Sequence, residues 1–153
     1  MHIALYQPDI PQNTGTILRM AACFNLAVDI IGPAGFDLSA HALKRAGLDY
    51  LERAGLHLHR DFDSFLRQRV QKEELRLILS TTKATTSYLD FTFDRRDILL
   101  MGRESAGVPD RVHNSADARI RIPMQSGNRS LNLAVSTAII TSEALRQTNG
   151  FIF

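Results

Sequence analysis

Two near-continuous apolar runs constrain the fold of this chain more than any other feature. They are "RLILSTT" at 76–82 and "DILLMG" at 97–102. Such runs are typical of strands that are buried on both faces, as in a parallel sheet covered by helices on both sides. The sequence therefore predicts an α/β fold built on a parallel sheet.

The remaining elements alternate in the order that such a sheet requires. Strand patterns occupy 2–7, 27–32, 55–60 and 118–124, and helical spacing occupies 14–26, 39–47, 63–74 and 130–146. We expect Asn13 or Thr14 to cap the first helix, Ser39 the second and Ser130 the last. The chain has 153 residues without an internal repeat or a linker, so we predict a single domain over 1–153.

Composition excludes several classes of protein. The chain is 44% hydrophobic and 22% charged, which is typical of a globular domain. No apolar run is long enough to span a bilayer and the N-terminus lacks the features of a signal peptide, so we expect a cytoplasmic protein with no membrane partner. The single cysteine, Cys23, excludes an internal disulfide and a Cys-rich zinc site.

Histidine and arginine give weaker signals. His57 and His59 alternate on a predicted strand without a further ligand set, so we favour a solvated strand face there and predict no metal site. Of the 18 basic residues, 15 are arginine. The planar guanidinium suits phosphate groups, although an Arg-rich genome would give the same composition.

Three predicted strands end in loops that are rich in glycine and polar groups. The loops are "QPDIPQNTG" at 7–15, "MGRESAGVP" at 101–109 and "IPMQSGNRS" at 122–130. In parallel α/β folds, ligands bind beyond the carboxyl ends of the strands. The usual dinucleotide, P-loop and nucleophile-elbow motifs are absent from the sequence, so we predict a ligand site of another kind at these loops.

Individual residues in or near these loops each allow two interpretations. Arg19 interrupts the apolar pattern of a predicted helix, so it either belongs to the site or forms an ordinary surface ion pair. Gly102 would let a ligand lie against bare backbone, and Glu104 would position a loop or hold a cation, unless both belong to an ordinary turn. Ser130 and Asn132 lie where unpaired N–H groups of a helix start attract a carboxylate or a phosphate.

As a set, these stretches resemble a known family. "PQNTGTILR", "MGRESAGVP" and "IPMQSGNRSLNLAVS" are similar to the three motifs of SPOUT-class RNA 2′-O-ribose methyltransferases. "LKRAGLDY" at 43–50 and "STTKA" at 80–84 narrow the resemblance to the compact bacterial enzymes that modify the tRNA wobble nucleotide. The resemblance covers nearly the full chain. It implies a SPOUT-type parallel sheet flanked by helices, with a C-terminal deep trefoil knot.

The resemblance also implies a cofactor and its binding residues. S-adenosylmethionine would be held largely by backbone and would leave as S-adenosylhomocysteine. The positions that match the cofactor contacts are Ser80, Gly102, Ile122, Met124, Ser130 and Leu131. The matching polar site residues are Asn13, Arg19, Glu104, Ser130 and Asn132. The protein would be a homodimer in which each site is completed by the partner subunit's Arg19.

Some positions depart from the family pattern. Ser80 and Met101 stand where the family often has a hydrophobic residue and Phe, respectively, and backbone contacts would tolerate both changes. The usual Tyr of the last helix is missing, and Thr141 and Ser142 occupy that region. The family's tyrosine role in orienting the substrate is therefore not carried over to this chain.

The expected activity is 2′-O-methylation of the wobble nucleotide, a cytidine or modified uridine at position 34, in the anticodon loop of tRNA-Leu isoacceptors. Arg45 and Arg129 are expected to contact RNA phosphates. A guanidinium stays protonated, so Arg19 should polarise the ribose hydroxyl and grip a phosphate rather than act as a base. The alternatives are a SPOUT enzyme for another RNA (rRNA or another tRNA site) and a non-catalytic RNA-binding protein on the same scaffold.

Overall fold

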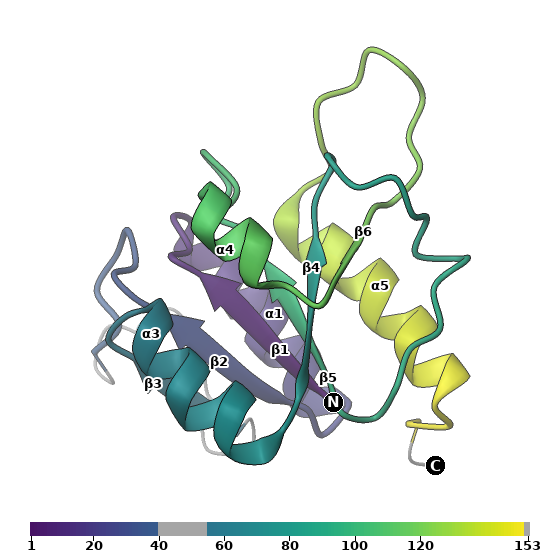
Figure 1. Ribbon diagram of the computed structural model, residues 1–153. Coiled ribbons are helices and arrows are strands. Elements are labelled where there is room, and N and C mark those ends of the chain that lie inside the picture. The colour runs from purple at the N-terminus through teal and green to yellow at the C-terminus, as the bar shows by residue number, and fades with distance from the viewer. Residues whose placement is uncertain (40–54, 152–153) are drawn as a thin grey trace.

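The computed structural model describes residues 1–39 and 55–151 and contains one six-stranded sheet (Figure 1). Its strand order is β3-β2-β1-β5-β4-β6, and every neighbouring pair is parallel. The predicted parallel sheet is therefore confirmed. The strands are β1 (His2–Tyr6), β2 (Ala27–Ile31), β3 (Leu56–His59), β4 (Arg76–Ser80), β5 (Asp97–Met101) and β6 (Ala118–Ile120).

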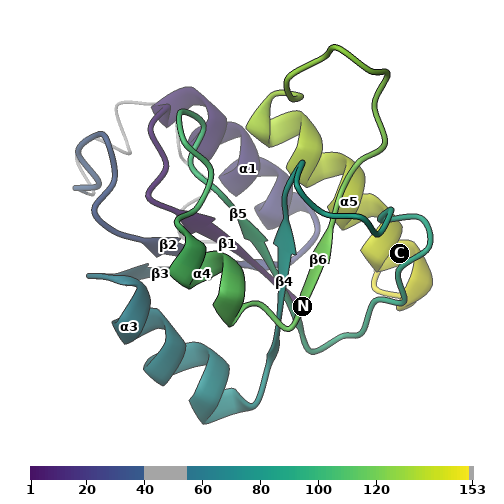
Figure 2. The same ribbon diagram turned by 45° about the horizontal axis from the view of Figure 1, so that its top comes forward.

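Helices cover both faces of the sheet (Figures 1 and 2). Helices α1 (Pro11–Cys23) and α5 (Leu133–Gln147) pack on one face. Helix α3 (Phe62–Phe65), which continues into the π-helical segment η1 (Leu66–Gln71), and helix α4 (Asp110–Ser115) pack on the other. Residues of both faces alternate along each strand, so Ile3 and Leu5 contact the α1 side, while Ala4 and Tyr6 contact the α3 side.

The two apolar runs are buried as predicted. All five residues of β5 are buried, as are the three central residues of β4. Two-sided burial explains why these segments show no polar alternation.

Helix α1 begins earlier than the sequence suggested. Pro11 is its first residue and Ile10 precedes it, so the prediction that Asn13 or Thr14 caps this helix was wrong. Proline suits the first helical position because its fixed φ matches the helix and its missing N–H needs no partner there. Asn13 consequently lies within the first turn, and its side chain makes contacts elsewhere.

Helix α5 begins later than predicted. Its cap is Asn132, whose Oδ1 accepts hydrogen bonds from Ala134 N at 2.9 Å and Val135 N at 3.3 Å. The prediction that Ser130 caps the helix was therefore wrong. A carbonyl oxygen of an asparagine caps as well as a serine hydroxyl, and the choice here follows from where the loop enters the helix.

Three further predictions have mixed outcomes. The strand expected at 118–124 ends at Ile120, and Arg121 continues only in backbone hydrogen bonds with Thr86 (2.9 Å) and Tyr88 (2.9 Å). His57 is exposed, but His59 is buried, so a solvated face was wrong for His59. The helix expected at 39–47 lies, beyond Ser39, outside the described residues.

His59 instead belongs to a buried polar cluster. Its Nε2 lies 2.7 Å from Oδ1 of Asp29, which is fully buried, and Nε of Arg69 lies 3.1 Å from the same oxygen. Among the described residues, no group of three or more His, Cys, Asp or Glu side chains is arranged to hold a metal ion. No helix in this part of the chain is long and apolar enough to cross a membrane.

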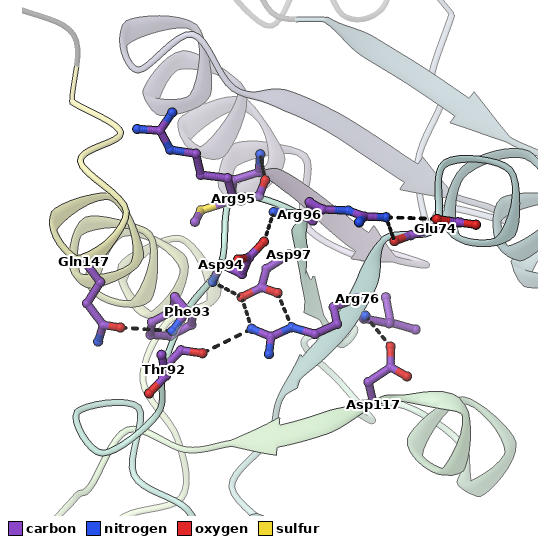
Figure 3. Close-up of polar contacts among 12 residues, drawn as sticks. Glu74, Arg76, Thr92, Phe93, Asp94, Arg95, Arg96, Asp97, Asp117 and Gln147 are labelled. Atoms are coloured by element: carbon purple, nitrogen blue, oxygen red, sulfur yellow. Dashed lines mark hydrogen bonds and ion pairs between the residues drawn. The ribbon is translucent and has the colours of Figure 1, made fainter.

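An ion pair joins the amino ends of the neighbouring strands β4 and β5 (Figure 3). The fully buried carboxylate of Asp97 accepts from Arg76 Nε at 2.6 Å and Nη2 at 2.9 Å, and from Asp94 N at 2.8 Å. Arg76 also donates to the carbonyl of Thr92 at 3.1 Å. These bonds join the first residue of β4 to β5 and to the segment that precedes it. They lie at the amino ends of the strands, opposite the loops that follow the carboxyl ends.

Removing this carboxylate should destabilise the fold without touching those loops. We expect Asp97→Ala to lower the free energy of unfolding by about 3 kcal/mol, because it leaves Arg76 and the Asp94 N–H without their acceptor. Urea denaturation measures the change. The exposed Asp90 provides the control, since Asp90→Ala should change stability by less than about 0.5 kcal/mol. Equal stability of the two variants would contradict this role for Asp97.

Candidate functional site

A cavity of about 520 Å³ lies at the carboxyl ends of β4 and β5. Its walls are residues 79–83, 101–108 and 129–133, together with Ile10, Asn13, His113 and Ser136. The volume is in the range of pockets that bind cofactors. The lining combines apolar side chains such as Leu79, Met101 and Leu131 with hydroxyl, amide and charged groups. This mixture fits a ligand that has both an aromatic base and charged groups, as S-adenosylmethionine does.

Most of the site residues predicted from the sequence meet at this cavity. The predicted residues that line it are Asn13, Ser80, Gly102, Glu104, Arg129, Ser130, Leu131 and Asn132. Ile122 and Met124 do not line it: Ile122 packs against a core cluster beneath α5, and Met124 is half-buried in the following loop. Arg19 is exposed on α1 and does not line the cavity of its own chain. Arg45 lies outside the described residues.

Three of these residues form a continuous chain of hydrogen bonds. Asn132 Nδ2 donates to Asn13 Oδ1 at 2.9 Å, and Asn13 Nδ2 donates to Glu104 Oε1 at 3.1 Å. The second carboxylate oxygen of Glu104 accepts from the backbone N–H of Asp9 at 2.8 Å. Asn13 is only 8% exposed. The three loops that looked separate in the sequence are thus joined by side chains more than 90 residues apart.

Asp9 was not singled out by the sequence, yet it anchors the second loop. Its carboxylate is ion-paired with the Arg103 guanidinium and accepts from Ser105 N at 3.1 Å and Ser105 Oγ at 2.5 Å. The hydrogen bonds from Arg103, and then those from Ser105, hold the pKa of Asp9 well below its usual range. The pattern of an acid after the first strand and a base after the motif glycine was visible, but nothing in the sequence paired the two.

Gly102 is required by its own loop. A Cβ at this position would lie 2.8 Å from the carbonyl carbon and 2.9 Å from the Cα of Gly107. The backbones of Arg103 and Gly107 exchange two hydrogen bonds, of 3.0 and 2.8 Å, which close the loop. Gly107 itself has a φ of +66°, which favours glycine. Close packing of the loop, rather than bare backbone beneath a ligand, accounts for this glycine.

His113 is a second residue that the sequence did not indicate. It lines the cavity, and Arg119 Nε donates to its Nδ1 at 3.1 Å. Because Nδ1 accepts, the ring proton lies on Nε2. That atom is buried and has no hydrogen-bond partner within the described part of the chain. One ring nitrogen of this side chain is therefore left without a hydrogen-bond partner among the described residues.

The fold and the cavity together define a class: a parallel α/β protein that binds a ligand where three strand-end loops meet. The family model described as the SpoU rRNA Methylase family matches residues 1–142. The chain therefore belongs to the SpoU methylase family.

Two relatives are similar over almost all of their length. A protein of Beijerinckia indica named tRNA (cytidine(34)-2'-O)-methyltransferase is 54% identical over 145 residues, which cover 95% of this chain and 90% of that protein. A protein of Ancylobacter novellus with the same name is 51% identical over 149 residues, which cover 97% of this chain and 94% of that protein.

Solved structures give the same picture. One, described as giving structural insights into the 2-OH methylation of C/U34 on tRNA, has a TM-score of 0.87 at 40% identity and covers 97% of this chain and 96% of its own. An AdoMet-bound rRNA methyltransferase from Sinorhizobium meliloti has a TM-score of 0.83 at 27% identity, over 95% of this chain and 55% of that one. The predicted SPOUT-type sheet is thus confirmed by its structural neighbours.

Proposed function

We propose that this protein transfers a methyl group from S-adenosylmethionine to the ribose 2′-oxygen of the wobble nucleotide of tRNA, cytidine or modified uridine at position 34. The observation that carries the proposal is identity above 50% to two enzymes named for this reaction, over at least 90% of each protein. The polar chain at the cavity and the loops around it supply a site for such chemistry. Such an enzyme would work in the cytoplasm.

The cavity is the proposed cofactor site. Ser80, Gly102, Ser130 and Leu131 would hold S-adenosylmethionine, mainly through backbone, whereas Ile122 and Met124, in the segment after β6, lie outside the cavity. When bound, the cofactor supplies an electrophilic methyl group and leaves as S-adenosylhomocysteine.

The protein's part in the reaction is position and charge. We assign to Arg19 the task of gripping a phosphate beside the target nucleotide and polarising its 2′-hydroxyl, which stabilises the alkoxide that develops. Arg129, at the cavity, and Arg45 would contact other phosphates of the anticodon loop. Small domains of this size read such loops by stacking on splayed bases and by phosphate contacts.

The proposed active unit is a homodimer in which the partner subunit's Arg19 completes each site. Three exposed hydrophobic side chains support an interface at the starts of α1 and α5: Ile10 (41% exposed), Leu131 (40%) and Val135 (49%). Two of them, Ile10 and Leu131, line the cavity, so a subunit that covers this patch would lie beside the site.

The proposed knot would form at the C-terminal part of the sheet. The backbone bonds of Arg121 with Thr86 and Tyr88 hold the segment after β6 against the segment after β4, where a threaded chain would need such contacts. The knot itself rests on the family resemblance.

Nucleoside mass spectrometry of leucine tRNAs tests the substrate. Cells that lack the gene should have no 2′-O-methylation at the wobble ribose, and expression of this chain should restore it. A wobble ribose that is equally methylated in both strains would contradict the assignment. A methylation lost elsewhere, in rRNA or at another tRNA position, would favour the second candidate, a SPOUT enzyme for another RNA. An unchanged RNA with retained RNA binding would indicate a non-catalytic protein.

A further inference from the structure

The series of hydrogen bonds from Asn132 to Glu104 runs in one direction from donor to acceptor. The way in which Asn132 caps α5 sets that direction. Asn132 is the cap of α5, so its Oδ1 must face the N–H groups of Ala134 and Val135. Its amide NH₂ is then left to donate to Asn13 Oδ1. An amide that accepts on its oxygen must donate from its nitrogen, so Asn13 can only donate to Glu104.

Glu104 is therefore an acceptor on both sides. One oxygen accepts from Asn13 and the other from the backbone N–H of Asp9. A carboxylate is the side chain that meets two donors without supplying one. The hydrogen bonds of the loop that follows β5 thus depend on which way the cap of α5 points, although the two lie on different loops.

A second set of bonds holds the same loop from its other side. The Asp9 carboxylate accepts from Arg103 and Ser105, which flank Glu104, while the Asp9 N–H donates to Glu104 itself. Residues 103–105 are thus held against residue 9, and both carboxylate oxygens of Glu104 already accept hydrogen bonds. These contacts favour a carboxylate that serves as an anchor.

We propose that Asn132, Asn13 and Glu104 form a directional relay and that Glu104 is a positioning residue, which orders the cavity walls and does not receive the ribose proton. The inference rests on the proposed methyl transfer, but its structural part does not. The proposal requires one carboxylate among the three side chains, but it does not require that this carboxylate stand at residue 104.

An exchange of the two groups tests this requirement. In Glu104→Gln, the NH₂ group of the new amide faces either that of Asn13 or the N–H of Asp9, and turning the Asn13 amide only moves the clash to Asn132, which the helix holds. In Asn13→Asp, two carboxylates face each other. The double variant Asn13→Asp/Glu104→Gln restores every bond. Its introduced amide donates to the introduced carboxylate, that carboxylate accepts from Asn132, and the oxygen of the introduced amide accepts from the N–H of Asp9.

The measurements are the melting temperature, the affinity for S-adenosylmethionine by calorimetry, and kcat and KM on a leucine tRNA. We expect each single variant to lose about tenfold in cofactor affinity and to melt several degrees lower. The double variant should recover to within about threefold of the original protein in affinity and kcat. Gln12→Glu, at an exposed neighbouring position, controls for the added charge.

Each outcome decides a separate point. A double variant that stays as unstable or as weak in binding as the single variants would overturn the relay. If it recovers melting temperature and affinity but not kcat, the carboxylate is needed at residue 104 for chemistry, and the positioning role is wrong. If the original protein methylates no leucine tRNA, the proposed function fails, and the relay is then judged by melting temperature and cofactor affinity alone.

Discussion

Replacing Arg19 with alanine should reduce methyl transfer by about a hundredfold to a thousandfold and leave the affinity for S-adenosylmethionine within a few-fold. Arg19 is exposed on α1 and lies outside the cavity of its own chain, so its loss should not disturb cofactor binding. The expected size is that of removing one preorganised group that stabilises a developing oxyanion. Single-turnover assays on a leucine tRNA and calorimetry with the cofactor measure the two quantities separately.

Lysine should not replace this arginine. An ammonium group carries the charge but cannot bind a phosphate with two parallel hydrogen bonds, so Arg19→Lys should stay severely impaired. Arg67→Ala is the matched control, because Arg67 is an exposed arginine of η1 on the other face of the sheet. A large loss of cofactor affinity in folded Arg19→Ala would show that the role is misassigned, as would full activity.

Gly102→Ala should have the opposite profile: loss of cofactor binding as the first defect. The new Cβ would stand 2.8 to 2.9 Å from backbone atoms of Gly107, which cannot rotate away as a side chain would. We expect the loop at 102–107 to open, the cofactor affinity to fall by more than about tenfold, and the stability to fall by about 1 to 3 kcal/mol.

Gly107→Asn is the matched control for this loop. Nothing lies within 4 Å of a Cβ at Gly107, and asparagine tolerates its φ of +66° better than other side chains. This variant should therefore keep most of its affinity. If Gly102→Ala binds the cofactor as well as Gly107→Asn does, the close packing of the loop is not what the site requires.

Combined at a cofactor concentration too low for Gly102→Ala to bind, the Arg19→Ala and Gly102→Ala variants also test the shared site. In a mixed dimer of Arg19→Ala and Gly102→Ala chains, one cavity is intact and receives the partner subunit's Arg19. Random pairing of equal amounts should restore about a quarter of the original activity, since half of the dimers are mixed and each has one working site. Co-expressed chains that remain as inactive as either variant alone would mean that each subunit uses its own Arg19.

The parts of this structure that the sequence predicted are those in which a local pattern reports burial. The apolar runs of β4 and β5 identified the core of the sheet because residues buried on both faces leave no room for polar alternation. Glu104 and Asn132 were selected because they lie in the polar stretches that follow predicted strands, and both line the cavity. The SPOUT-type fold came from the resemblance of the three loops.

The parts that it did not predict depend on contacts between distant segments. Both misplaced helix caps had several suitable residues nearby, and the choice followed from Pro11 at α1 and from the loop that leads into Asn132 at α5. The sequence suggested a surface position for His59, but its ring contacts the carboxylate of Asp29, which is 30 residues away in the chain. Asp9 and Arg103 are joined across 94 residues, a pairing that no local pattern can report.

The order of strands in the sheet has a consequence for synthesis on the ribosome. Strands β1, β2 and β3 form one half of the sheet and β5, β4 and β6 the other, and the halves meet only where β1 pairs with β5. The inner edge of the first half therefore stays unpaired until β5 has left the exit tunnel. Because an unpaired strand edge favours aggregation, we expect the nascent chain to be most prone to aggregate before β5 emerges.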